Sequence, residues 1–167
     1  SDILDYIVIA CDNPKAEEVL SKFEDPRLSF FLRDREDTIR SRSIAPLLEA
    51  VTKKFDPQQS GVTVLSFVQS PFVTSRSIEE AIFTLVSTDA DSCFAVQELA
   101  RTVYRRSPYG LEQLNHATQL SGDHDKIYIE ARTVVAARNK NFSTGAVTGP
   151  AVAHFVVSED ETYFIDS

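Results

Sequence analysis

The stretch from Gly61 to Glu98 constrains the fold most, because its pattern is that of a strand, a helix and a second strand. Residues 62–68 form an almost unbroken apolar run that is rich in β-branched and aromatic side chains and too short for a free-standing helix. Ser70-Pro71 ends this run, since proline cannot donate a hydrogen bond to a sheet. Residues 92–96 form the next predicted strand. Between the two strands, apolar residues recur at the spacing of one helix face, namely Ile78, Ala81, Ile82, Leu85 and Val86. The expected unit is a buried strand, a crossover helix and a parallel strand.

A second block of the same kind precedes this unit. Residues 5–10 have the pattern of a buried strand, Asp12-Asn13-Pro14 that of a helix start, and residues 28–32 that of another short strand. A further helix is predicted over residues 44–55, with Ser43 as its cap. Because strands and helices alternate, we predict an α/β fold with three layers, Rossmann-like, built on a mostly parallel sheet.

The pattern is looser after Val96. We predict a short strand at 102–104, a turn at 107–110, an exposed loop over 111–125, strands over 127–137 and 152–157, and a loop or short helix over 139–149. No linker or internal repeat interrupts the chain, so we expect residues 1–167 to form one domain. Open α/β sheets bind ligands at the C-terminal ends of their strands, and this rule points to Gln69 and Ser70.

Composition narrows the class of partner. The net charge of −8 and the pI near 4.9 disfavour a nucleic-acid groove or an anionic membrane, because phosphate backbones need clustered Lys and Arg. No apolar run approaches the roughly 18 residues of a membrane span. The two cysteines, Cys11 and Cys93, fall at or beside predicted buried strands and are expected to be small core residues. These features favour a cytoplasmic protein.

The same residues carry a resemblance to a known family. A strand that ends in Ser70-Pro71, a helix that opens with Ser77-Ile78-Glu79-Glu80, and then Asp89-Ala90-Asp91-Ser92 before a strand resemble the cytidylyltransferases that make CMP-sialic acid and CMP-Kdo. The likeness extends at low identity from about residue 5 to the end of the chain. It implies a nucleotide-diphospho-sugar transferase fold and the transfer of CMP from CTP to a nonulosonic or Kdo-like sugar acid, with release of pyrophosphate.

The resemblance also implies roles for individual residues. Arg33, Ser41, Ser43 and Asp12 are similar to the positions that hold the nucleotide, and Gln69 and Ser70 to those that hold the sugar. Asp166 corresponds to one of the aspartates that bind Mg²⁺. As family members are commonly dimers, the resemblance implies a homodimer as well, with residues 131–150 as its packed arm. A further expectation is that Asp166 lies close enough to Gln69 and Ser70 to meet the same ligand.

The chain departs from the family pattern at several of these places. Phe67 and Phe164 stand where the family has a sugar-binding Gln and a metal-binding Asp, while Ala131 and Val135 replace an Asn and a Tyr. The glycine-rich and basic loop that the family carries on its first strand does not occur in these residues. We therefore expect a sheet without its first strand and a chain that is incomplete at its N-terminus.

Alternatives remain open at each position. Arg33 could pair with a neighbouring acid such as Asp34, Asp12 could cap a helix, and Asp166 could be an exposed acid. Gln69 and Ser70 could form only a polar turn before the next helix. For the whole chain, the alternatives to an enzyme are a non-catalytic member of the same fold that binds a nucleotide sugar or a protein partner, and an unrelated α/β protein.

Overall fold

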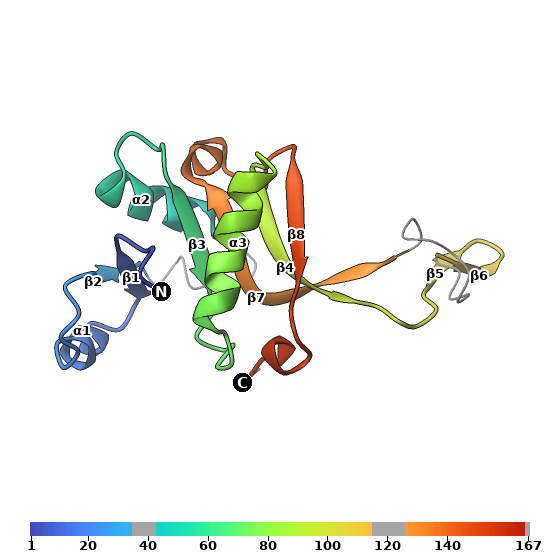
Figure 1. Ribbon diagram of the computed structural model, residues 1–167, viewed down its shortest axis with the longest axis horizontal. Coiled ribbons are helices and arrows are strands. Elements are labelled where there is room, and N and C mark those ends of the chain that lie inside the picture. The colour runs from blue at the N-terminus through green and yellow to red at the C-terminus, as the bar shows by residue number, and fades with distance from the viewer. Residues whose placement is uncertain (35–42, 115–125, 166–167) are drawn as a thin grey trace.

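The computed structural model describes residues 1–34, 43–114 and 126–165, and Figure 1 shows the arrangement of their helices and strands. Three units of strand and helix come first: β1 (Ile7–Cys11) with α1 (Lys15–Leu20), β2 (Leu28–Leu32) with α2 (Ala45–Phe55), and β3 (Val62–Ser66) with α3 (Ser75–Ser87). The later elements are mainly strands: β4 (Ser92–Glu98), β5 (Tyr104–Ser107), β6 (Gly110–Gln113), β7 (Tyr128–Arg138), η3 (Asn139–Thr144), β8 (Val152–Val156) and η4 (Asp160–Thr162). The α/β character predicted from the alternating pattern is confirmed.

The main sheet has the strand order β3-β7-β4-β8. β7 runs antiparallel to both β3 and β4, whereas β4 and β8 are parallel. β3 and β4 therefore point the same way, as expected for a crossover unit, but they are not neighbours. The expectation that two adjacent parallel strands form the site is wrong in this respect, because a strand from far along the chain lies between them.

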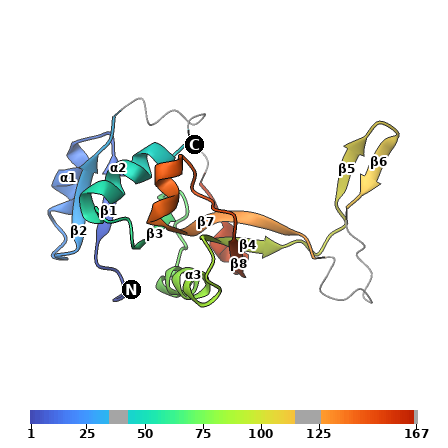
Figure 2. The ribbon, with the colours of Figure 1, turned by 90° about the horizontal axis from the view of Figure 1, so that it is seen from above.

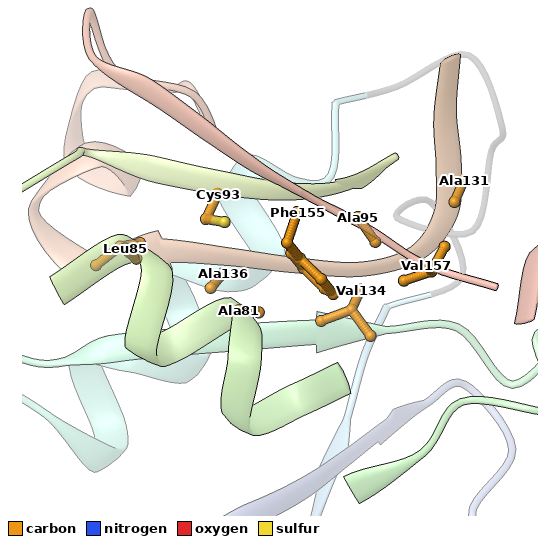
Figure 3. Packing of buried hydrophobic residues seen from close by; sticks show 9 residues of the cluster. All are labelled: Ala81, Leu85, Cys93, Ala95, Ala131, Val134, Ala136, Phe155 and Val157. Atoms are coloured by element: carbon orange, nitrogen blue, oxygen red, sulfur yellow. The ribbon is translucent and has the colours of Figure 1, made fainter. Parts of the chain in front are cut away.

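Helices cover both faces of this sheet, which gives the predicted three layers (Figure 2). Successive side chains of a strand point to opposite faces, and β7 shows this clearly. Val134 and Ala136 pack towards α3 with Ala81 and Leu85, in the cluster drawn in Figure 3. Ala137, on the other face, packs with Leu48 of α2 and Phe142 of η3. Cys93 of β4 is fully buried in the first cluster, as predicted for a small core residue.

The unit formed by β1, α1 and β2 is packed much less well. β1 and β2 form a separate parallel pair, and none of the residues in these three elements is buried. Ring contacts with α2 connect the unit to the rest of the molecule: Tyr6 lies 5.2 Å from Phe55, and the Lys54 ammonium lies 5.9 Å from the centre of the Phe31 ring. β3 is half-exposed although both its faces carry apolar side chains, because only one of its edges is paired. β1 and β2 therefore form a sheet of their own beside the main sheet.

A hairpin of β5 and β6 projects away from the layers in both views (Figures 1 and 2). The turn predicted at residues 107–110 connects its strands, but residues 110–113 form β6 and not the predicted loop. The rest of that predicted loop, 115–125, lies outside the described residues. The arm expected at residues 131–150 is also wrong, since this stretch supplies the central strand β7 and the packed turn η3.

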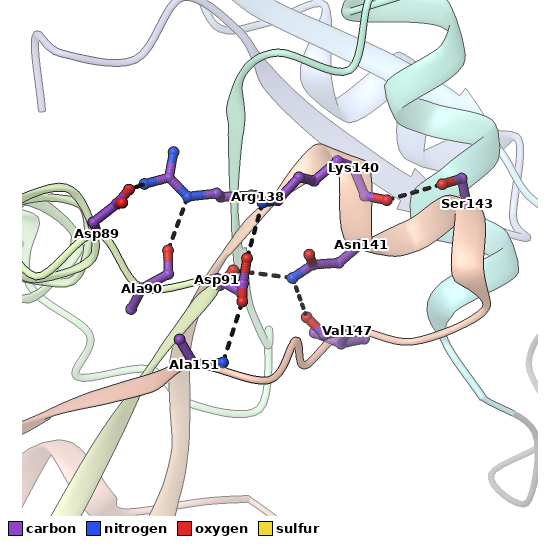
Figure 4. Close-up of polar contacts among 9 residues, drawn as sticks. All are labelled: Asp89, Ala90, Asp91, Arg138, Lys140, Asn141, Ser143, Val147 and Ala151. Carbon is purple, nitrogen blue, oxygen red and sulfur yellow. Dashed lines mark hydrogen bonds and ion pairs between the residues drawn. The ribbon is translucent and has the colours of Figure 1, made fainter.

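Asp91 organises the end of the sheet at which β4 begins (Figure 4). Its carboxylate accepts a hydrogen bond from the Ala151 amide at 3.1 Å and forms an ion pair with Lys140 at 3.0 Å. Its carbonyl accepts from the Asn141 side-chain amide at 2.9 Å. The Lys140 ammonium and the Ala151 amide lower the pKa of Asp91 below its usual value. These contacts tie β4, β7 and β8 together at the end of the sheet opposite to Gln69 and Ser70, so they serve the framework and not the predicted site.

Candidate functional site

The turn that follows β3 is held firmly in place by Ser70. The Ser70 amide donates to the Phe67 carbonyl at 2.9 Å, and its hydroxyl donates to the Arg132 carbonyl at 3.1 Å. Ser70 is only 5% exposed, whereas the side chain of Gln69 is exposed. The hydroxyl of Ser70 is thus used to fix β7 beside the turn, and Gln69 is the residue of this pair whose side chain can reach a ligand.

The end of the chain returns to this turn. The Ile165 amide donates a hydrogen bond to the Gln69 carbonyl at 2.9 Å. Asp166, the predicted Mg²⁺ ligand, lies outside the described residues, but its neighbour Ile165 is in direct contact with the predicted sugar-binding turn. The two segments that were expected to share a ligand, almost 100 residues apart in the sequence, therefore meet on one edge of the sheet.

Aromatic contacts reinforce this meeting of segments. The rings of Phe67 and Phe164 meet edge to face, with centroids 6.5 Å apart, and Phe72 and Tyr163 make a similar contact at 5.9 Å. Offset and edge-to-face aromatic pairs of this kind are favourable beyond the area they bury. Phe67 and Phe164 are the two residues for which the resemblance led us to expect a sugar-binding and a metal-binding position, and they contact each other.

The first turn of α3 also contacts the C-terminal segment. Thr74 is the N-cap of α3 and accepts a hydrogen bond from the Ser77 amide at 3.2 Å. The Ser77 hydroxyl donates to the Glu161 carboxylate of η4. A carboxylate beside the first turn of a helix is favoured by the helix dipole. The contact fixes η4 over the start of α3 and so directs the chain towards Gln69.

The predicted nucleotide-binding residues form a separate group at the ends of β1 and β2. The Arg33 amide donates to the Cys11 carbonyl at 3.1 Å, and its guanidinium lies 3.9 Å from the Asp12 carboxylate. Asp12 is not the helix cap, since the Asn13 side chain accepts from the Lys15 amide instead. The Nε of Arg33 is buried and has no hydrogen-bond partner among the described residues. Arg33 thus has donor capacity left for a ligand. Its ion-pair partner among the described residues is Asp12, while Glu36 and Asp37, which were alternatives to Asp34 as partners, lie outside them.

The predictions for Ser43 and Ser41 have different outcomes. The hydroxyl of Ser43 accepts a hydrogen bond from the Ala45 amide at 3.2 Å, but the N-cap of α2 is Ile44, so the prediction that Ser43 is the cap is wrong. Ser41 lies outside the described residues, so its role stays a prediction. No hydrogen bond or ion pair joins the group around Arg33 to the group around Gln69 within the described ranges.

One residue at the Gln69 turn was missed by the sequence reasoning. β7 changes register against β4 between Phe94, which pairs with Val135, and Val96, which pairs with Glu130. Arg132 lies in the resulting bulge with a φ of +55°, in the left-handed region. This backbone conformation costs a non-glycine residue roughly 1–2 kcal/mol. Nothing in the sequence signals it, since arginine is not a residue that favours such a conformation.

Metal-ligating groups, helix hydropathy and surface hollows do not add a second candidate site in the described residues. Within the described ranges, no group of three or more His, Cys, Asp or Glu side chains could hold a metal ion. None of the described helices combines the length and the hydropathy that crossing a bilayer requires. Two surface hollows lie elsewhere: one of about 500 Å³ on α1, lined by Pro14, Lys15, Glu17, Glu18 and Ser21, and one of about 410 Å³ beside α3, lined by Ile3, Glu79, Ile82, Phe83 and Val86.

Solved structures with a similar fold were then compared with the chain. The 4-diphosphocytidyl-2C-methyl-D-erythritol synthase of Anaerococcus prevotii matches with a TM-score of 0.67 at 14% identity, over 95% of this chain and 72% of that one. The 2-C-methyl-D-erythritol 4-phosphate cytidylyltransferase of Thermus thermophilus matches with a TM-score of 0.51 at 13% identity, over 99% and 78%. The chain shares the fold of cytidylyltransferases. No protein-family model and no curated protein sequence matches it.

Proposed function

We propose that the protein is a cytidylyltransferase that transfers CMP from CTP to an acceptor of the sugar type. The similarity of fold to two cytidylyltransferases supports this reaction class. The observation that carries the proposal is the hydrogen bond between Ile165 and Gln69, because it brings the segment expected to hold Mg²⁺ to the turn expected to hold the acceptor. As the finer hypothesis, the acceptor is a 2-keto-3-deoxy sugar acid such as sialic acid or Kdo.

In this reaction a hydroxyl oxygen of the acceptor attacks the α-phosphorus of CTP. The new O–P bond replaces the bond to the β-phosphate, and pyrophosphate leaves. Little covalent chemistry is asked of the protein, so catalysis depends on positioning both substrates and on balancing the negative charge of the phosphates. We assign Gln69 to the acceptor, and Arg33, Asp12, Ser41 and Ser43 to the nucleotide.

Mg²⁺ is part of the proposal, with Asp166 as its protein ligand. Mg²⁺ keeps several waters and commonly takes one or two carboxylates together with oxygens of a substrate phosphate. A single aspartate fits this pattern, and the aromatic side chain of Phe164 excludes that position as a second ligand. When bound, the ion would neutralise phosphate charge; the residues described above would orient the acceptor.

The competing proposal is a non-catalytic protein that binds a nucleotide sugar. The contact between Phe67 and Phe164 favours it, since an aromatic pair occupies positions at which the resemblance implies polar ligands. Ala131 and Val135 favour it as well, because both are buried in the framework and neither offers a polar group to a ligand.

Release of pyrophosphate decides between the two. The full chain is incubated with CTP, Mg²⁺ and, in separate arms, sialic acid, Kdo or 2-C-methyl-D-erythritol 4-phosphate. Asp166→Asn is expected to abolish release, whereas Asp160→Asn, a matched change of an exposed acid in η4, is expected to leave it intact. Binding of CTP without release in any arm would favour the non-catalytic alternative.

We further propose that the protein is a homodimer formed through the hairpin of β5 and β6. Tyr109 is fully exposed and Leu111 is 75% exposed, and the hairpin makes no close packing with the described layers. Arg105 is paired with Glu112 across the hairpin at 2.9 Å, and the exposed Arg106 on β5 is the cation that we propose to face a second copy of this chain, whose net charge is −8. Light scattering should give twice the mass of the chain, and a Tyr109→Ser, Leu111→Ser variant should give the single mass. A wild-type monomer at high concentration would exclude this interface.

The cytoplasm is the proposed location. Both cysteines are free in the structure, which suits a compartment that keeps thiols reduced. A reaction that consumes CTP also requires access to the cellular nucleotide pool.

A further inference from the structure

Arg132 stands at the point where β7 leaves both of its partner strands. The pairing of β3 with β7 ends at Ser66 and Val134, and the ladder with β4 is interrupted between residues 130 and 135 of β7. Residues 131–133 are therefore free of both ladders, beside the C-terminal end of β3. Bulges of this kind are found next to binding sites, where they redirect a side chain.

The strained backbone of this bulge is held from several sides. The neighbours Ala131 and Thr133 are 7% and 1% exposed, so they anchor the bulge in the framework. The hydroxyl of the buried Ser70 donates to the Arg132 carbonyl at 3.1 Å. A left-handed residue that is not glycine persists only where its surroundings fix it, and such residues cluster at functional sites. Ser70 is both the clamp on Arg132 and part of the predicted acceptor site.

The side chain of Arg132, in contrast, is exposed and uncommitted. Among the described residues, its guanidinium has no hydrogen bond and no ion pair, although other arginines of the chain are paired; Arg27, for example, lies 2.7 Å from Asp25. Arg132 thus carries an exposed guanidinium, and its backbone carbonyl contacts the turn whose Gln69 carbonyl accepts from the Ile165 amide. A guanidinium presents a planar fork of donors that matches the oxygens of a carboxylate or a phosphate.

We propose that Arg132 binds the anionic group of the acceptor. This inference rests on the proposed function, because it assigns a residue to the acceptor half of the same site. The group it recognises is an oxyanion, either the carboxylate of a sugar acid or the phosphate of a sugar phosphate. The Ser70 hydroxyl holds the backbone of the bulge beside the turn of Gln69 and Ser70.

Arg132→Gly is the decisive variant, since it removes the guanidinium and also relieves the left-handed conformation at no steric cost. It should raise the melting temperature by about 2–4 °C, because the strain of a left-handed residue other than glycine is relieved. The same variant should lose at least tenfold in affinity for the anionic acceptor. A gain in stability together with a loss of binding is the signature of a strained binding residue, and a purely structural residue would not show it.

Binding is measured by calorimetry on the full chain without CTP, so the result does not depend on turnover. The probes are sialic acid and its methyl ester in one arm, and 2-C-methyl-D-erythritol 4-phosphate and its dephosphorylated form in the other. The wild type should prefer one charged probe to its neutral analogue by tenfold or more, and Arg132→Gly should abolish that preference. Arg132→Lys should retain part of it, and Arg76→Ala, a change of an exposed arginine in α3, should retain all of it.

The arm that shows the preference identifies the oxyanion as carboxylate or phosphate. An unchanged preference in Arg132→Gly, or a wild type that prefers neither charged probe, overturns the inference. Failure of the proposed function is a separate result, namely the absence of pyrophosphate release with CTP while the preference for the charged probe persists.

Discussion

Asp56 connects three elements of the framework that supports the candidate site. One of its carboxylate oxygens accepts a hydrogen bond from the Gly61 amide at 2.7 Å and another from the Asn139 side-chain amide at 2.8 Å. Asn139 is 3% exposed and in turn accepts from the Thr63 hydroxyl at 2.6 Å. The end of α2, the start of β3 and the start of η3 are thereby fixed to one another. We predict that Asp56→Ala is among the more destabilising single changes outside the apolar core.

The magnitude follows from the contacts. A hydrogen bond to a charged group contributes about 1.5–3 kcal/mol, and Asp56 accepts two in a half-buried position, so the loss should be about 3 kcal/mol. In urea unfolding this corresponds to a midpoint lower by about 1–2 M at an unchanged slope. Asp56→Asn keeps an acceptor oxygen but not the charge, so its free energy of unfolding should lie between those of the wild type and Asp56→Ala. Asp5→Ala, at an exposed acid, should change stability by less than about 0.5 kcal/mol.

The loss of unfolding free energy in Asp56→Ala should also depend on pH. Hydrogen bonds from the Gly61 amide and then from Asn139 lower the pKa of Asp56 from its ordinary value of 3.8. A carboxyl whose pKa is depressed in the folded state contributes its stability above the unfolded pKa and loses it as the pH falls through the folded pKa. The difference between wild type and Asp56→Ala should therefore be full at pH 7 and shrink below about pH 3.8. A difference below about 0.5 kcal/mol at pH 7, or one that grows in acid, would refute the reasoning.

Three further predictions concern the framework. Gly149→Ala should lower the unfolding free energy by about 1–3 kcal/mol, because the added methyl would overlap the Cβ of Asp91 and lie 2.7 Å from its Cγ; an unchanged urea midpoint would contradict this. Burial raises the pKa of the Cys93 thiol to about 11, so at pH 8 Cys11 should react with a thiol reagent at least tenfold faster than Cys93, and equal rates would be inconsistent with the packing. Thr74→Ala removes the N-cap of α3 and should cost about 1 kcal/mol in thermal unfolding, a value that a neutral substitution would disprove.

The local sequence pattern was sufficient to predict most of the helices and strands. The apolar run that starts at Val62 is a strand, the stripe from Ile78 to Val86 lies on a helix, and the turn at 107–110 connects two strands. Each of these depends on side chains a few positions apart, and periodicity reports such interactions directly. The three-layer arrangement followed from the alternation of strands and helices for the same reason.

The strand order could not be predicted in the same way. β3 and β4 are separated by β7, and the pairs that insert it join residues far apart in the sequence, such as Val64 with Ala136. Alternation of strand and helix favours adjacent parallel strands but cannot show that a later antiparallel strand enters between them. The left-handed conformation of Arg132 could not be predicted for a related reason, since it depends on the register shift of β7 and on the Ser70 hydroxyl.

The inserted strand changes how the candidate site is built. In a purely parallel sheet, the crevice between adjacent strand ends would be lined by the loops that follow those strands. Here the antiparallel β7 passes through that place, and it does so as a bulge with Arg132 exposed between buried neighbours. The turn after β3 carries Gln69, the C-terminal segment meets this turn at Ile165, and β7 carries the exposed Arg132. Under the proposal, recognition of an anionic acceptor depends on Arg132 of β7 and not on Phe67 or Phe164, whose rings contact each other.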